Sequence, residues 1–305
     1  GWNIGAGGYS SAAASYVSQN NLVSNNRIVN GGQLVGHGSG IYMNQSGDNE
    51  VSYNEIKTMS RGGIVVQGKA LVYLPSTLYG VTLTENNYYD FCHTRNNVIK
   101  FNDVSNCFLD SQDVGLLYAS QHGKDNILDN NRFHDSAVTI PDGWAHGIYI
   151  DDIGSYWTIR NNIIYGIDGD NGSPHYMKGV YNTFTNNIIA DNGYSDNNFD
   201  RNCYMTRTPN DHLILSRNIH YQAGGKYVYY INEWVDDPDR ILESDNNVFY
   251  HPGGSYEVRG IPGFYFDSWA KWKSLWDNKY DQNSVTADPL FVDRANHDYT
   301  VQAGS

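Results

Sequence analysis

Short apolar segments interrupted by asparagine recur along most of the chain. The pattern Asn-x-apolar-x-x-Asn-x-apolar first appears in Asn21–Ile28 (NLVSNNRI) and Asn49–Ile56 (NEVSYNEI). The apolar residues are often β-branched and spaced by two, so each copy predicts a strand, a bend at the asparagine and a second strand. The second asparagine of successive copies falls at Asn26, Asn54, Asn102, Asn131, Asn162, Asn187, Asn218 and Asn246.

The spacing of these asparagines indicates a solenoid. Successive intervals are 28, 48, 29, 31, 25, 31 and 28 residues, and the interval of 48 suggests two turns of about 24 residues. Asparagine tolerates unusual backbone angles at a bend and bonds to nearby backbone groups. Stacked turns therefore predict an asparagine ladder along the solenoid axis.

A further short strand, usually entered through glycine, lies between the asparagine copies. No turn contains an apolar stretch of helical length, which excludes leucine-rich and helical repeats. The repeat resembles right-handed parallel β-helices, so we predict an all-β solenoid over residues 1–262. The glycine-led segments are Gly40–Tyr42, Gly63–Val65, Gly115–Tyr118, Gly147–Tyr149 and Gly179–Tyr181.

Residues 263–305 differ from the repeat and are predicted to complete the same domain. Phe264–Trp276 has apolar and aromatic residues at helical spacing, which predicts one short amphipathic helix. The following ADPLFVD…DYTVQAGS resembles the closing segment of many bacterial β-helix carbohydrate-active enzymes. Those enzymes usually continue into a Ser-Pro-Ala stretch that is absent here, so we expect the chain to be part of a longer protein.

Composition narrows the classes of partner. The 305 residues include 20 Lys+Arg and 33 Asp+Glu, a formal net charge of −13, which argues against nucleic acid or an anionic membrane surface as partner. No run of 18 apolar residues predicts a membrane span. Cys92, Cys107 and Cys203 show no CxxC spacing, and one disulfide or three buried thiols both remain open.

Tyrosines occupy one register of the solenoid. Counting back thirteen residues from Asn102, Asn131 and Asn162 gives Tyr89, Tyr118 and Tyr149. Facing outward, these rings would form an aromatic strip suited to a sugar; facing inward, they would be an ordinary core stack.

Carboxylates and imidazoles concentrate on the same two turns. SQDVGLLYASQHG supplies Asp113 and His122, and DGWAHGIYIDD supplies Asp142, Trp144, His146, Asp151 and Asp152. A D-x-G-x-x-Y segment one turn before G-I-Y-x-D-D resembles β-helix glycoside hydrolases of the α-L-fucosidase/xylanase-like group. That resemblance implies catalytic carboxylates at Asp113 and at Asp151 or Asp152.

Glycoside hydrolysis requires two carboxyl groups about 5–5.5 Å apart for retention or about 6.5–9.5 Å apart for inversion. With Tyr118 opposite Tyr149, Asp113 lies opposite Trp144, seven positions from Asp151, or roughly 23 Å along a straight strand. Only a tight bend at Asp113-Val114-Gly115 would bring the pair together. Asp142 is therefore an alternative catalytic carboxylate.

Other roles for these residues remain open. Aspartates commonly cap turns in loops. His122 and His146 are candidates for positioning a substrate hydroxyl, and Trp144 for sugar stacking or for covering the core. His37 and Arg61 are expected to border the site. Asp168 and Asp170 alternate as in a calcium loop, but no Glu completes the ligand set, so we expect a plain turn and no required cofactor.

Three functions fit these patterns. The leading prediction is a secreted, periplasmic or cell-surface glycoside hydrolase acting on a poly- or oligosaccharide, with no nucleic-acid partner. The second is a polysaccharide lyase or epimerase, which acts on uronic acids and usually needs Lys or Arg at the scissile bond. The third is a non-catalytic glycan-binding β-helix of the tailspike or adhesin kind.

Overall fold

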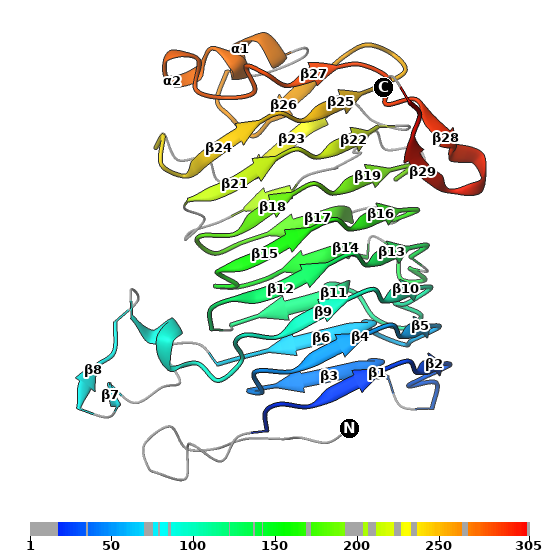
Figure 1. Cartoon of the computed structure of the whole chain (residues 1–305), viewed down its shortest axis with the longest axis vertical. Coiled ribbons are helices and arrows are strands. Elements are labelled where there is room, and N and C mark those ends of the chain that lie inside the picture. Colours follow the sequence, from blue (N-terminus) through cyan, green and yellow to red (C-terminus); the bar gives the residue numbers. More distant parts are fainter. Residues whose placement is uncertain are drawn as a thin grey trace.

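Three parallel sheets form the walls of a β-helix, whose coils stack from β1 at one end to β24 at the other (Figure 1). The computed structural model describes residues 18–303 except 35, 70–75, 79, 85–86, 122, 137, 142, 169–171, 193–203, 207–211, 223–226, 233–236 and 264–267. Each coil contributes one short strand to each wall, so sequence neighbours lie in different sheets and sheet neighbours lie one coil apart. The predicted parallel β-helix is confirmed.

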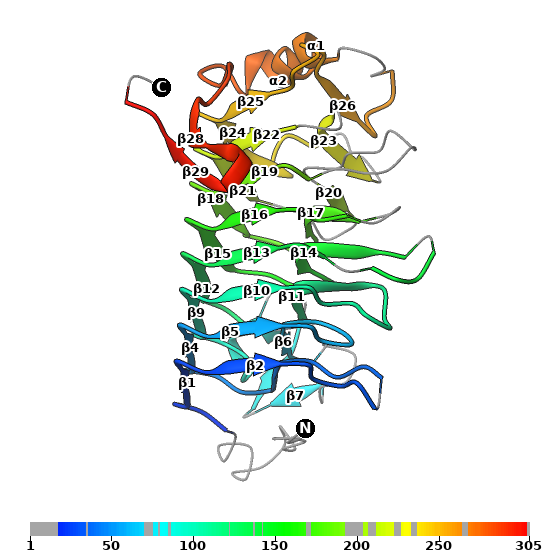
Figure 2. The ribbon, with the colours of Figure 1, turned by 90° about the vertical axis from the view of Figure 1, so that its right-hand side faces the viewer.

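The strands of each sheet follow the chain in order, as the turned view in Figure 2 shows. Sheet 1 contains β1 (Leu22–Ser24), β4 (Glu50–Ser52), β9 (Val98–Lys100), β12 (Asn126–Asp129), β15 (Trp157–Arg160), β18 (Thr183–Thr185), β21 (Leu213–Ser216) and β24 (Ile241–Asp245). Sheet 2 contains β2 (Arg27–Val29), β5 (Glu55–Lys57), β10 (Asp103–Ser105), β13 (Arg132–His134), β16 (Ile163–Tyr165), β19 (Ile188–Ala190), β22 (Ile219–Tyr221), β25 (Val248–Tyr250) and β27 (Val285–Thr286). Sheet 3 contains β3 (Ile41–Asn44), β6 (Ile64–Gln67), β11 (Val114–Ser120), β14 (Ala145–Ile150), β17 (Ser173–Met177), β20 (Tyr204–Thr206), β23 (Tyr227–Asn232) and β26 (Glu257–Arg259).

The predicted asparagine ladder runs along the corner between sheets 1 and 2. In its middle, Asn131 Oδ1 accepts hydrogen bonds from the backbone N of Asn102 at 2.9 Å and from Asn102 Nδ2 at 3.0 Å. Asn131 Nδ2 in turn donates to Asn162 Oδ1 at 3.0 Å. The last rung is Asn247 rather than the predicted Asn246, because Asn218 donates to Asn247 Oδ1. Asn246 instead takes the left-handed position, with φ of 58°, that precedes each rung.

We predict that Asn131→Leu lowers the free energy of unfolding by about 3 kcal/mol, because it leaves the buried amide of Asn102 without its acceptor. Urea denaturation measures the change. Asn130→Gly is the matched control, since Asn130 is exposed and its φ of 56° suits glycine. Equal stability of the Asn131 variant and the wild type would contradict a stabilising ladder.

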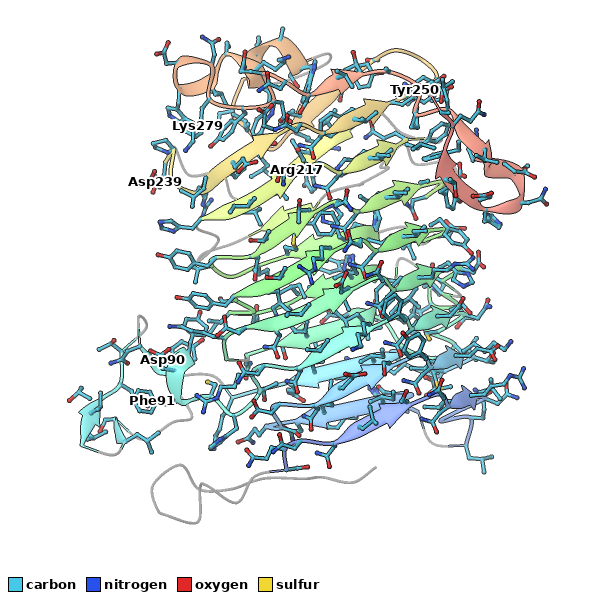
Figure 3. The ribbon with its side chains drawn as sticks, in the orientation of Figure 1. Asp90, Phe91, Arg217, Asp239, Tyr250 and Lys279 are labelled. Atoms are coloured by element: carbon cyan, nitrogen blue, oxygen red, sulfur yellow. The ribbon has the colours of Figure 1, made fainter. Side chains whose placement is uncertain are left out.

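An insertion, not an extra turn, explains the long interval between Asn54 and Asn102. Strand β6 is followed by the hairpin β7 (Thr77–Leu78) and β8 (Val81–Thr82) and by the 3₁₀ helix η3 (Tyr88–Phe91), before β9 resumes the solenoid. The prediction of two turns was therefore wrong. Figures 1 and 3 show the insertion projecting from the solenoid, with Asp90 and Phe91 on it. Asp90 Oδ1 forms an ion pair with Lys124 Nζ at 2.6 Å, which links the insertion to the solenoid.

The placement of Tyr89 in the tyrosine register was also wrong. Tyr89 lies on η3, buried in a separate cluster of the insertion, and Val65 takes the position opposite Tyr118. The offset of thirteen residues fails there because the insertion lengthens the coil. The cluster consists of Leu78, Leu83, Tyr88, Tyr89 and Cys92.

Two short helices close the C-terminal end, where the sequence predicted one. They are α1 (Trp269–Lys273) and α2 (Leu275–Asn278), and residues 264–267 of the predicted helix lie outside the described residues. Trp272 is buried, and its Nε1 donates to Asp281 Oδ2 at 2.8 Å. Asp281 Oδ1 also accepts from Asn247 Nδ2 at 3.1 Å, and Ser284 Oγ accepts from the backbone N of Asn247 at 2.8 Å, so these two side chains together take the place of the next ladder rung.

The closing segment folds back along sheet 2 as the antiparallel hairpin β28 (Phe291–Asp293) and β29 (Asp298–Val301), joined by η4 (Arg294–Asn296) (Figure 2). Phe291 and Tyr299 pack on Tyr165 and Tyr221, which point outward from that sheet. The hairpin thus covers an apolar part of the outer surface of sheet 2.

Candidate functional site

The outward face of sheet 3 carries a column of tyrosines in one register. Tyr118 of β11 pairs with Tyr149 of β14, which pairs with Tyr176 of β17, and the register continues to Tyr204 and Tyr230. Alternating neighbours such as Ile148 and Ile150 point into the core. The rings of Tyr118, Tyr149, Tyr176 and Tyr230 form their own cluster outside that core.

Neither alternative for the tyrosines describes them fully. They face outward, yet Tyr149 is only 2% exposed and Tyr176 only 4% exposed, so these two do not form an open strip. Their rings stack with centroids 4.7 Å apart, and the ring of His146 packs edge-on against both. His146 is itself buried, with Nδ1 2.7 Å from Ser173 Oγ, so it supports the tyrosine pair from the sheet side.

The tyrosine hydroxyls hold the two leading candidate carboxylates. Tyr118 Oη donates to Asp151 Oδ2 at 2.7 Å, and Tyr149 Oη donates to Asp113 Oδ1 at 3.3 Å. The Tyr149 hydroxyl also interacts with Asp151. The negative charges of Asp113 and Asp151 act on both hydroxyls, so the two carboxylates and the two tyrosines form one cluster.

A bend at the start of β11 makes this approach achievable. Asp113 has φ of 55° and donates its backbone N–H to the Trp144 carbonyl at 2.7 Å, in the predicted register. At Gly115, a Cβ would lie 2.1 Å from the Leu117 carbonyl oxygen and 2.9 Å from Tyr149 Cβ. Only glycine fits so close a backbone approach. Asp113 thus turns immediately before the strand, Val114 and Gly115 remain paired with Ala145 and His146, and the side chain of Tyr149 reaches the Asp113 carboxylate.

Lys178 completes the cluster and was missed from the sequence. Its ammonium forms ion pairs with Asp151 Oδ1 and, at 3.1 Å, with Asp152 Oδ1. The ammonium also lies 5.5 Å from the Tyr149 ring centroid and 5.2 Å from that of Tyr176, within cation–π range.

The error behind this omission lies in the strand assignment of one coil. Gly179–Tyr181 was predicted as the glycine-led strand, but the strand is Ser173–Met177, and Gly179 is in a bend. This coil spans only 25 residues between Asn162 and Asn187, so its third strand comes earlier than the glycine suggests. Matching Tyr176 to Tyr149 would have placed Lys178 opposite Asp151.

The electrostatics of the cluster follow from burial and from Lys178. Burial raises the pKa of Asp151, but the hydrogen bond and charge of Lys178 outweigh it and leave that pKa below its ordinary value. Burial, together with the nearby negative charge of Asp151, raises the pKa of the Tyr118 and Tyr149 hydroxyls. At neutral pH both tyrosines are therefore protonated donors and Asp151 is ionised.

Of the remaining predicted site residues, three lie beside Asp113 or its neighbours and two are not described. Trp144 is exposed and borders Asp113 through its backbone. Arg61 Nη2 lies 3.5 Å from the Asp113 carbonyl oxygen, and Arg61 Nη1 lies 3.1 Å from His37 Nδ1. Asp142 and His122 lie outside the described residues.

The described residues form neither a metal-binding cluster nor a disulfide. Within them, no group of three His, Cys, Asp or Glu side chains could hold a metal ion. The backbone N of Asp168 donates to the Ser136 hydroxyl and its carbonyl accepts from it, both at 2.7 Å, while Asp170 is not described. Cys92 and Cys107 are buried free thiols whose pKa burial raises to about 12, and Cys203 is not described.

Comparison with protein-family models, curated proteins and solved structures finds no match to this chain. The structure itself defines the class of the molecule. It is a parallel β-helix with an Asp–Tyr–Lys cluster on the outer face of sheet 3. In the part of the chain that is described, no helix has the length and apolar character needed to cross a membrane.

Proposed function

We propose that the protein is a glycoside hydrolase that uses Asp113 and Asp151, on adjacent coils of sheet 3, to cleave a poly- or oligosaccharide. The observation that carries this proposal is that two neighbouring tyrosine hydroxyls each hold one of the carboxylates, Tyr118 that of Asp151 and Tyr149 that of Asp113. Because these two tyrosines pair on adjacent coils, the two carboxylates belong to one cluster, as the acid pair of a glycosidase must.

The charges around the cluster favour a neutral glycan. Lys178 is already balanced by Asp151 and Asp152, so its ammonium does not offer an unpaired positive charge to a uronate. The ionised carboxylate of Asp151 would in addition repel a substrate carboxylate close by. The proposed location remains secreted, periplasmic or cell-surface, where such a glycan would be met.

One observation favours a polysaccharide lyase as a second candidate. Among the described residues, the guanidinium of Arg61 contacts no carboxylate, although it lies beside Asp113. An arginine in that setting could neutralise a uronate at the scissile bond, which is the role that a lyase requires.

The test is an assay of the chain against panels of neutral and uronic glycans, with two readouts. Reducing-end release without ultraviolet-absorbing unsaturated products is expected, and Asp113→Asn should lower kcat/KM about a hundredfold, since general acid catalysis supplies that order of rate. Unsaturated products from uronic glycans would replace the hydrolase by the lyase. Glycan binding without turnover would leave a non-catalytic glycan-binding β-helix.

A further inference from the structure

Register places Lys178 directly opposite Asp151 on the neighbouring coil. Ile150 pairs with Met177, and the backbone N of Lys178 donates to the Ile150 carbonyl at 2.8 Å. The side chain of Lys178 is only 14% exposed and that of Asp151 only 10%, so their ion pair is shielded from bulk water. Shielding strengthens the attraction between the charges relative to an exposed pair.

Both oxygens of Asp151 accept from donors. Oδ1 receives the Lys178 ammonium and Oδ2 receives the Tyr118 hydroxyl at 2.7 Å. A carboxylate in this position is held as the anion, because a proton on either oxygen would displace one of these donors.

Asp113 has a different environment. Its side chain is exposed, and its Oδ1 receives only the longer bond of 3.3 Å from Tyr149. Within the described part of the chain, no Lys, Arg or His side chain forms an ion pair with its carboxylate. Asp113 is therefore the carboxylate that a substrate oxygen can approach from solvent.

We infer that Lys178 is a positioning residue that holds Asp151 as the anionic partner of the reaction and leaves Asp113 as the proton donor. This inference rests on the proposed function, and it assigns the two carboxylates their roles. The glycosidic C–O bond breaks as the Asp113 proton passes to the leaving oxygen. The new C–O bond forms either to Asp151 or to a water molecule whose proton Asp151 accepts.

The test replaces Lys178 in two ways. Lys178→Met is expected to lower kcat/KM at least tenfold and to move the acidic limb of its pH profile to higher pH, while Lys178→Arg keeps the charge and restores most of both. Arg160→Met is the matched control, because Arg160 forms an ion pair of 2.9 Å with Asp129 away from the site. This control should change neither quantity.

A second readout does not depend on activity. Carboxyl-carbon NMR should show Asp151 titrating at higher pH in Lys178→Met than in the wild type. In the wild type, the side-chain carbons of Lys178 should follow the same transition as Asp151, and this measurement holds even where Lys178→Met fails to fold. The inference would be overturned if Asp151 titrated at the same pH in both proteins, or if the Lys178 side-chain carbons did not change during the titration of Asp151. Loss of the proposed function would appear separately, as a wild-type chain that cleaves no glycan.

Discussion

Replacing Asp151 by Asn is expected to lower kcat/KM about a thousandfold on the glycan that the wild type cleaves. The amide cannot act as a nucleophile or accept a proton, and such groups supply rate factors of this order. The loss should exceed that of Asp113→Asn, since the exposed position of Asp113 admits water that can replace part of its acid function. Kinetics of the purified variants measure both losses.

Asp129→Asn is the control for this comparison. Asp129 forms an ion pair with Arg160 at 2.9 Å, so its replacement also breaks a carboxylate–cation contact, but on the strand β12 of sheet 1. Wild-type activity is expected for this variant. Folding of Asp151→Asn is checked by circular dichroism, and Lys178 keeps Asp152 as a partner at 3.1 Å in that variant. Full activity of folded Asp151→Asn would contradict the proposed role.

The second large effect is expected on stability in acid, from two histidines inside the solenoid. His175 stacks on Phe184 with centroids 4.3 Å apart, and His220 stacks on Phe249 at 5.0 Å. Burial lowers the pKa of His220 to about 3, and burial with the neighbouring His220 and His146 lowers that of His175 well below its ordinary value. Neither ring nitrogen of His175 has a hydrogen-bond partner among the described residues.

The sign of the effect follows from proton binding. The unfolded chain protonates these histidines near pH 6.5, whereas the folded chain keeps them neutral, so the unfolded state binds more protons as pH falls. Stability is complete above that pH and decreases toward pH 3 by up to about 1.4 kcal/mol per pH unit for each histidine. Urea denaturation at a series of pH values measures the slope.

Two variants separate this effect from general acid denaturation. His220→Phe should reduce the slope between pH 6.5 and 4. His134→Gln should not, because His134 lies between Asp103 and Asp135, whose hydrogen bonds outweigh burial and raise its pKa. The contribution of His134 is present below pH 6.5 and lost as pH rises through its higher folded pKa. An unchanged slope in His220→Phe would show that burial of this histidine does not limit stability in acid.

The sequence predicted the parts of the fold that repeat locally. Each rung from Asn26 to Asn218 could be found because an asparagine recurs beside apolar residues spaced by two, and both features act within one coil. The exchange of Asn246 for Asn247 shows the limit of this reasoning. Two adjacent asparagines fit the same pattern, and only the left-handed backbone at the first distinguishes them.

Coil length could not be predicted in the same way. An interval of 48 residues fits two short coils as well as one coil with an insertion. The asparagine bends do not limit the length of the loop that can be inserted between two strands of a coil. Tyr89 was misplaced for this reason, and Lys178 was missed because a coil shorter than its neighbours shifted the third strand. The relative positions of Asp113 and Asp151 could be predicted because the Tyr118–Tyr149 register spans two coils of similar length.

The insertion after β6 has a consequence for how such a protein can diversify. Ladder bonds pass from Asn54 to Asn102 at 2.9 Å as though the 48 residues between them were an ordinary coil. An insertion at the corner between sheet 3 and sheet 1 therefore leaves the stacking of the coils unchanged. Asp151, Asp152 and Lys178 lie at that same corner, immediately after β14 and β17. Added chain at this corner could thus change the surroundings of the proposed catalytic site while the stacking of the coils stays the same.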